Sequence, residues 1–168
     1  ELLQSRGGLS KLDTTQLSGR LLNVYNFKKY DGTYYLMAFT PKHIYSYDFS
    51  NQRFDILNLT YTTGTITIAA GTLDTVTGSG TSWESELKEG DYIKIGSGGV
   101  HTESTWYEIE SVDSDTQLTL TGNAVETAPG TAYVAVKIFS GSNTHYWDVT
   151  RFVDSSAGEV VVATQNVD

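Results

Sequence analysis

The sequence predicts an all-β protein, and three observations support this class. The composition is rich in residues that suit a pleated, half-buried surface, with 11 tyrosines and 12% aromatic residues, and it holds 16 glycines but only 2 prolines among 168 residues. Short segments alternate apolar and polar side chains between turn-forming residues, which is typical of strands. Finally, a strand–turn–strand segment near the start of the chain is echoed near its end.

The two echoes suggest a repeat that is interrupted by an insertion. The first echo joins residues 24–27 to 34–40, and the second joins 149–152 to 159–164. Their last residues, both threonine, are offset by 164 − 40 = 124 residues. Residues 61–138 read as a self-contained β module of 78 residues, and removing it leaves a period of 124 − 78 = 46 residues. That period is close to the roughly 40–50 residues of a β-propeller blade.

We therefore predict a small β-barrel or β-sandwich module inserted into an antiparallel, propeller-blade-like scaffold. The module is residues 61–138, and the discontinuous scaffold is residues 1–60 and 139–168. A second blade is expected to begin near Tyr133 or Thr144 and to contain about two strands. Because a propeller needs several blades to close, we expect the scaffold to be a fragment of a larger propeller. The first blade should contain four strands, at residues 20–27, 33–39, 43–48 and 53–57.

The module is expected to contain about five strands and one helical turn. Ser82 is placed to cap this turn, because a serine oxygen can accept a bond from an unpaired backbone N–H. Trp83 and Leu87 are spaced four residues apart, so both should lie on one face and close the end of the barrel. The strands are predicted at residues 65–69, 75–77, 91–95, 106–110 and 116–121.

Charge separates the module from the scaffold. The whole chain carries −9, and residues 61–138 hold three basic and eleven acidic side chains, which gives 3 − 11 = −8. Such a surface repels nucleic-acid phosphates and anionic lipid, so neither nucleic acid nor a membrane is an expected partner. Solubility is the main interpretation of this charge, and cation binding is the alternative.

No metal site is predicted from the residue spacing. His43, His101 and His145 are far apart and do not follow the spacing of metal ligands. Asp113 and Asp115 could begin a calcium loop, but the glycine and the downstream glutamate of an EF-hand are missing. We interpret that segment as a turn between two strands.

No catalytic site is predicted either. Glu108 and Glu110 share one face of a strand, about 6–7 Å apart, a spacing that could suit a glycosidase acid pair. Neither has a sequence cue for the buried setting that would separate their pKa values. The glycine-rich segments lack a following Lys-Ser/Thr, and no serine lies in a nucleophile elbow. We therefore expect a protein that is not an enzyme, with no catalytic residue and no cofactor. Asn58 begins a formal N-glycosylation sequon, which matters only in a eukaryotic secretory route.

Aromatic residues are the remaining candidates for function. Packing in the core and across strands is their main interpretation. The alternative is a stacking surface for sugar or an anchor for a protein contact. Trp106 is the best candidate contact residue, because strand alternation places it outward beside Glu108 while Tyr107 faces inward.

Parts of the sequence resemble proteins of tailed bacteriophages. One set of segments resembles a small β module that recurs in phage virion proteins: residues 76–83 (VTGSGTSW), 87–93, 106–109 and 111–120. The flanking sequence is similar to phage structural proteins with propeller-like repeats, at residues 8–12, 30–33 and 44–48.

This resemblance implies a non-enzymatic structural component of the virion, in the tail, neck or fibre region. Its expected partners are other virion proteins, in a homo-oligomer or hetero-oligomer, with a host-surface glycan as a further candidate. The alternative function is a carbohydrate-binding or receptor-binding module that uses exposed aromatic residues such as Trp106. The resemblance supplies no catalytic residues.

Overall fold

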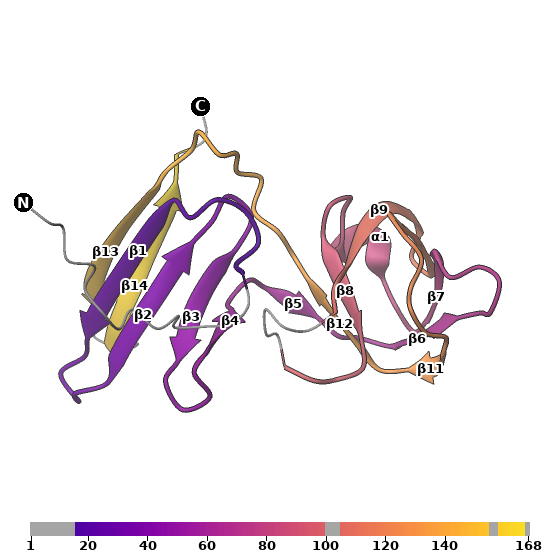
Figure 1. Cartoon of the computed structure of the whole chain (residues 1–168), viewed down its shortest axis with the longest axis horizontal. Helices are drawn as coiled ribbons and strands as arrows, with labels where there is room; N and C mark the ends of the chain where they lie inside the picture. The colour runs from indigo at the N-terminus through magenta and orange to yellow at the C-terminus, as the bar shows by residue number, and fades with distance from the viewer. Residues whose placement is uncertain (1–15, 100–104, 155–157, 167–168) are drawn as a thin grey trace, which may run out of the picture.

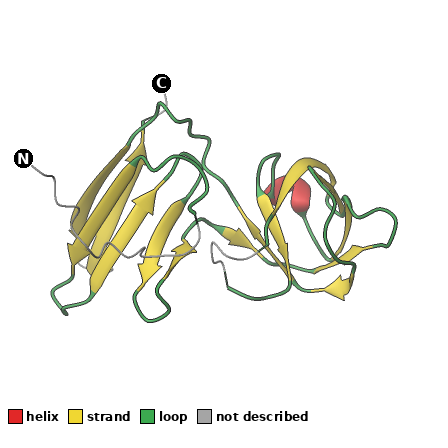
Figure 2. Cartoon of the chain, viewed as in Figure 1, coloured by secondary structure: helices red, strands yellow, loops and turns green. Residues whose placement is uncertain are grey.

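The part of the chain that the structure describes forms three antiparallel sheets and one helical turn (Figure 1). The computed structural model describes residues 16–99, 105–154 and 158–166. Two predictions, the histidine at position 101 and the resemblance at residues 8–12, lie outside these residues. Strands and loops make up nearly all of the described chain, and the turn α1 is the helical element in Figure 2. No helix among the described residues is long and apolar enough to cross a membrane.

The first sheet is a meander of four strands joined by consecutive hairpins. Its order is β1-β2-β3-β4, and each strand pairs with the next in antiparallel register. This confirms the four strands that turn residues and alternation predict. The strands are β1 (Asn23–Lys28), β2 (Tyr34–Phe39), β3 (Ile44–Asp48) and β4 (Arg53–Ile56).

A two-stranded hairpin, β13 (Trp147–Asp154) and β14 (Gly158–Gln165), covers one side of this meander. Met37, Phe39 and Trp147 form the buried cluster between them. Trp147 is fixed at this interface because its Nε1 donates to the carbonyl of Thr40 at 2.9 Å. The second echo in the sequence therefore packs on the sheet that contains the first.

The middle of the chain forms a separate sheet of eight strands. Their order is β11-β6-β7-β10-β9-β8-β12-β5. The turn α1 (Trp83–Glu86) lies between β7 and β8 in the sequence. The strands are β5 (Thr60–Tyr61), β6 (Thr65–Ile68), β7 (Thr75–Ser79), β8 (Tyr92–Ile95), β9 (Tyr107–Ser114), β10 (Gln117–Leu120), β11 (Ala128–Thr131) and β12 (Tyr133–Val136).

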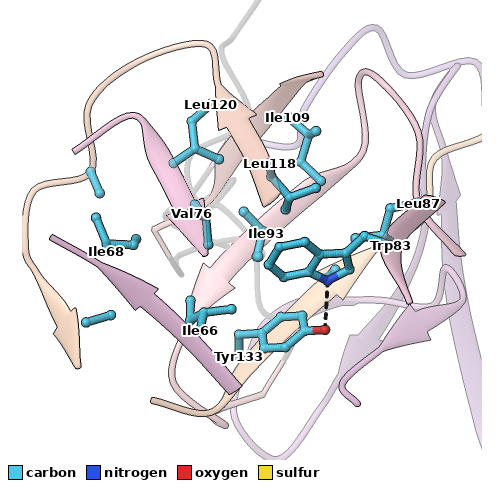
Figure 3. Packing of buried hydrophobic residues seen from close by; sticks show 13 residues of the cluster. Ile66, Ile68, Val76, Trp83, Leu87, Ile93, Ile109, Leu118, Leu120 and Tyr133 are labelled. Atoms are coloured by element: carbon cyan, nitrogen blue, oxygen red, sulfur yellow. Dashed lines mark hydrogen bonds between the residues drawn. The ribbon is translucent and has the colours of Figure 1, made fainter. Parts of the chain in front are cut away.

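The core of this unit is built from the inward positions of the alternating strands (Figure 3). Trp83 lies at its centre, and its Nε1 donates to the hydroxyl of Tyr133 at 2.9 Å. The Tyr133 hydroxyl donates in turn to the carbonyl of Thr63 at 2.7 Å. Leu87 joins the same cluster, as the four-residue spacing predicts. The other large buried side chains are Ile66, Ile68, Val76, Ile93, Ile109, Leu118 and Leu120.

The prediction of five strands missed β5, β11 and β12. The second blade was expected near Tyr133 or Thr144, but Tyr133 lies in β12, which pairs with β8 and β5 in the eight-stranded sheet. All four residues of β12 are buried. Tyr133 and Ala135 contribute to the core of the eight-stranded unit, whereas Val136 packs on the meander. A strand that is covered on both faces loses the alternation that identifies a half-buried strand.

These observations confirm the all-β class. The described strands of the eight-stranded sheet do not close into a barrel, since β11 and β5 are its two edges. The barrel or sandwich and propeller descriptions remain predictions, as do the exact domain boundaries.

Candidate functional site

A cleft runs along the junction between the meander and the eight-stranded sheet. We call it the junction cleft; it consists of three neighbouring cavities, all of which include Tyr92 in their walls. The inner cavity has a volume of about 140 Å³. Two outer cavities of about 410 and 290 Å³ adjoin it, and they share Ser18 and Trp106 with it respectively.

The inner cavity has aromatic walls contributed by both units. Tyr45 comes from the meander, and Tyr92 begins β8. His43 lies between them, with its ring centroid 5.7 Å from Tyr45 and 5.6 Å from Tyr92. Ile56 and Trp106 complete the apolar lining. An apolar cavity with a few polar groups at its rim is the usual form of a small-molecule site.

One pair of opposite charges lies at the mouth of the cleft. Lys42 Nζ is 3.5 Å from Glu108 Oε1, and both side chains are partly exposed, at 42% and 37%. Burial raises the pKa of Tyr92, and the neighbouring Glu108 carboxylate raises it further. Tyr92 therefore remains a neutral phenol at the centre of the cleft. An exposed pair of this kind adds little to stability, about 0–1 kcal/mol.

His43 is an uncharged part of the cleft wall. The residue is 3% exposed, and its Nδ1 has no hydrogen-bond partner within the described residues. Burial lowers the pKa of His43 to about 4, and the charge of Lys42 contributes to this shift. The imidazole is therefore neutral near pH 7.

Lys94, in β8 of the eight-stranded sheet, lies over the Trp106 ring. The Lys94 ammonium donates to the carbonyls of Gly98 and Gly99 at 2.7 and 2.5 Å, and it lies 5.6 Å from the centroid of the Trp106 ring. Lys94 is 8% exposed, and this burial lowers its pKa. The glycine-rich loop after β8 thus folds onto a lysine that neighbours the indole.

Asn58 fixes the point at which the two units join. Its Nδ2 donates to the carbonyls of Lys42 and Lys137, at 2.9 and 2.8 Å, and its Oδ1 accepts from the backbone N–H of Ile44 at 2.9 Å. Asn58 is 5% exposed, so the sequon asparagine is a buried structural residue in the folded chain. Through its bond to Lys137, this one side chain links the chain just before the inserted segment to the end of that segment.

The structure places Trp106 in the cleft rather than fully in solvent. It is half-buried, packs against the meander cluster that includes Tyr45, and lines two of the three cavities. Tyr107 packs against the module core, as alternation predicts. The role of Trp106 as a contact residue stays a prediction. Sequence reasoning did not find Tyr92 or Tyr45 as its neighbours, because no local pattern relates residues that are joined only by the packing of two sheets.

The other sequence candidates are dispersed. Glu108 lies at the cleft, whereas the exposed Glu110 lines none of the three cavities. His145 accepts a hydrogen bond from the backbone of Ser142, far along the chain from His43. Within the described residues, no group of three or more histidine or acidic side chains could hold a metal ion.

Asp113 and Asp115 have separate local roles. Asp113 accepts bonds from the hydroxyls of Ser111 and Thr119, at 2.7 and 2.9 Å, and these bonds lower its pKa. Asp115 Oδ1 accepts from the backbone N–H of Glu84 at 3.1 Å, at the start of α1. The expectation that Ser82 caps this turn is wrong, since the Ser82 side chain makes no cap hydrogen bond.

Comparisons with protein-family models, with curated proteins and with solved structures find no match to this chain.

Proposed function

We propose that this chain is a non-enzymatic structural component of a phage particle, in the tail, neck or fibre region, and that it works through protein–protein contacts. The resemblance of its sequence to phage virion proteins motivates the proposal. The packing of the β13–β14 hairpin on the face of the meander supports a propeller-like scaffold, because adjacent blades pack face to face.

The observation that carries the proposal is an apolar groove on the face of the meander opposite the β13–β14 hairpin. We call it the distal groove; its volume is about 540 Å³. Tyr34 and Phe49 in its wall are 61% and 56% exposed, and Val24 on the same side is 51% exposed. Exposed apolar surface of this kind is typical of protein interfaces, in which tyrosine and phenylalanine are enriched. The proposed occupant is a blade-like sheet of a neighbouring virion protein.

Mass spectrometry of purified particles tests the proposal. We expect peptides of this chain in particles that have been separated from cell lysate, and reduced incorporation when Tyr34 is changed to Arg. Tyr146→Arg is the matched control, because Tyr146 is similarly exposed at 58% but does not line the distal groove. Absence of the chain from purified particles would refute the virion assignment.

A second candidate function is carbohydrate binding. The aromatic lining of the junction cleft, with Trp106 and Tyr92, favours it. A glycan array tests it: binding that is lost in Trp106→Ala but kept in Tyr34→Ala would support this function, and a blank array would remove it.

A further inference from the structure

We infer that the junction cleft binds an uncharged oligosaccharide, with one sugar residue or substituent in the inner cavity and the neighbouring residues in the two outer cavities. This inference rests on the second candidate function and adds to it the class of saccharide and its placement along the three cavities.

The adjacency of the three cavities suits an elongated ligand. The inner cavity shares Tyr92 and Ser18 with one outer cavity, and Tyr92 and Trp106 with the other. Its own volume, about 140 Å³, is small, whereas the flanking cavities are two to three times larger. A chain of sugar units can therefore extend to both sides of Tyr92.

The chemistry of the lining matches the two kinds of surface on a sugar. The C–H face of a pyranose ring packs on aromatic side chains, and two partly exposed ones, Tyr92 and Trp106, line the inner cavity. Sugar hydroxyls both donate and accept hydrogen bonds, as do side-chain hydroxyls and amides. Such groups line the outer cavities: Ser142 and Asn143 on one side, and Thr121 and Asn123 on the other.

Charge favours an uncharged saccharide. Lys42 and Glu108 are the ionic side chains among the described residues that line the cleft, and they pair with each other. His43 is neutral near pH 7, so it offers no cation to an acidic sugar. The module that forms one wall carries −8 by sequence, which repels sialylated, sulfated or uronic-acid chains.

Tryptophan fluorescence gives a direct measurement of binding at this site. Trp83 and Trp147 are buried, at 0% and 5% exposed, and both indole N–H groups are hydrogen-bonded within the protein. A ligand in the cleft would therefore change mainly the emission of Trp106. We expect a saturable emission change with at least one uncharged trisaccharide from a panel of chitotriose, maltotriose, cellotriose and galactotriose. No saturable change is expected with sialyllactose or trigalacturonic acid.

Variants separate binding from folding. Trp106→Phe should abolish the fluorescence change, and Asn123→Ala should weaken binding of the positive trisaccharide at least threefold. Asn123 lies on an exposed loop, so its truncation should leave the thermal unfolding curve unchanged. Tyr34→Ala, in the distal groove, is the control and should bind as the wild type does.

The outcomes distinguish failure of the inferred saccharide class and site from failure of carbohydrate binding itself. If a glycan array shows binding only of acidic saccharides, carbohydrate binding stands and this inference is wrong. If uncharged saccharides bind equally well to wild type, Asn123→Ala and Trp106→Ala, the site lies elsewhere. If neither the array nor the fluorescence titration detects a saccharide, both the inference and the second candidate function fail, while the virion assignment is decided separately by mass spectrometry.

Discussion

At the scale of single residues, His43 makes stability depend on pH. Its pKa is lowered from 6.5 to about 4 in the folded chain, so the unfolded chain binds the proton more readily. Stability from this residue is therefore fully present above pH 6.5 and is lost as the pH falls towards 4. The groups that surround the imidazole are the rings of Tyr45 and Tyr92 and the ammonium of Lys42, which adds to the shift.

We expect the wild-type free energy of unfolding to fall by about 2 kcal/mol more between pH 7.5 and pH 5 than that of His43→Gln. The reason is that glutamine carries no proton-linked charge in the same buried position. Urea unfolding at the two pH values measures both slopes, and the carboxylates common to both proteins cancel in the comparison. Equal slopes would show that His43 titrates alike in the folded and unfolded chain.

The Tyr133 hydroxyl accepts from the buried Trp83 N–H (Figure 3) and donates to the backbone carbonyl of Thr63. Tyr133→Phe should lower the free energy of unfolding by about 1–3 kcal/mol, because the Trp83 N–H and the Thr63 carbonyl lose their partner. Tyr61→Phe is the matched control. Its hydroxyl accepts from the exposed N–H of Ser82, which water can satisfy, so the loss should be smaller. Equal losses in the two variants in a urea titration would contradict this account.

At the scale of elements, the turn α1 depends on a residue from another part of the sheet. Asp115, in the β9–β10 turn, accepts from the N–H of Glu84, and its carbonyl accepts from the Thr81 hydroxyl at 2.5 Å. Ser82, the residue in the local cap position, contributes no side-chain bond. A helix of four residues needs such support, because a single turn is not stable by itself.

Substitution distinguishes the distant cap from the local one. Asp115→Ala should cost about 1 kcal/mol of unfolding free energy, and Ser82→Ala should cost about 0.5 kcal/mol or less. Thermal unfolding monitored by near-UV circular dichroism suits this test, because Trp83 in α1 is a buried aromatic reporter. A larger loss for Ser82→Ala than for Asp115→Ala would restore the sequence-based expectation.

At the scale of the whole molecule, two structural units share one junction. The backbone N–H of Lys137 donates to the carbonyl of Leu59 at 2.9 Å, so the chain leaves the eight-stranded unit beside the point where it enters. The meander and the β13–β14 hairpin have a cluster of their own, around Phe39 and Trp147. The junction adds the packing of Val136 and Trp106 on the meander.

Replacing residues 60–136 by a short glycine linker should leave a folded scaffold that is less stable than the intact chain. The linker can be short because Leu59 and Lys137 are hydrogen-bonded neighbours. The loss of stability follows from exposing Tyr45 and its neighbours, at about 25 cal/mol per Å² of apolar surface. Dispersed amide signals in a ¹H–¹⁵N spectrum, with a lower thermal midpoint, are the expected result. An unfolded spectrum would show that the scaffold cannot fold without the eight-stranded unit.

The sequence by itself determined the elements with clear local patterns. Alternation predicts that Ile66, Ile68, Leu118 and Leu120 face inward, and all four are buried, because the side chains of a strand point to opposite faces in turn. Turn residues predict the four strands of the meander for a similar local reason.

The tertiary structure alone decided the strands and contacts that depend on two surfaces meeting. β12 has no alternation because both of its faces are covered, and α1 is capped from a distant turn. The junction cleft combines His43 and Tyr45 with Tyr92 and Trp106, which lie 47 to 63 residues further along the chain. Such neighbours are set by how sheets pack on each other, and that packing leaves no periodic signal in the sequence.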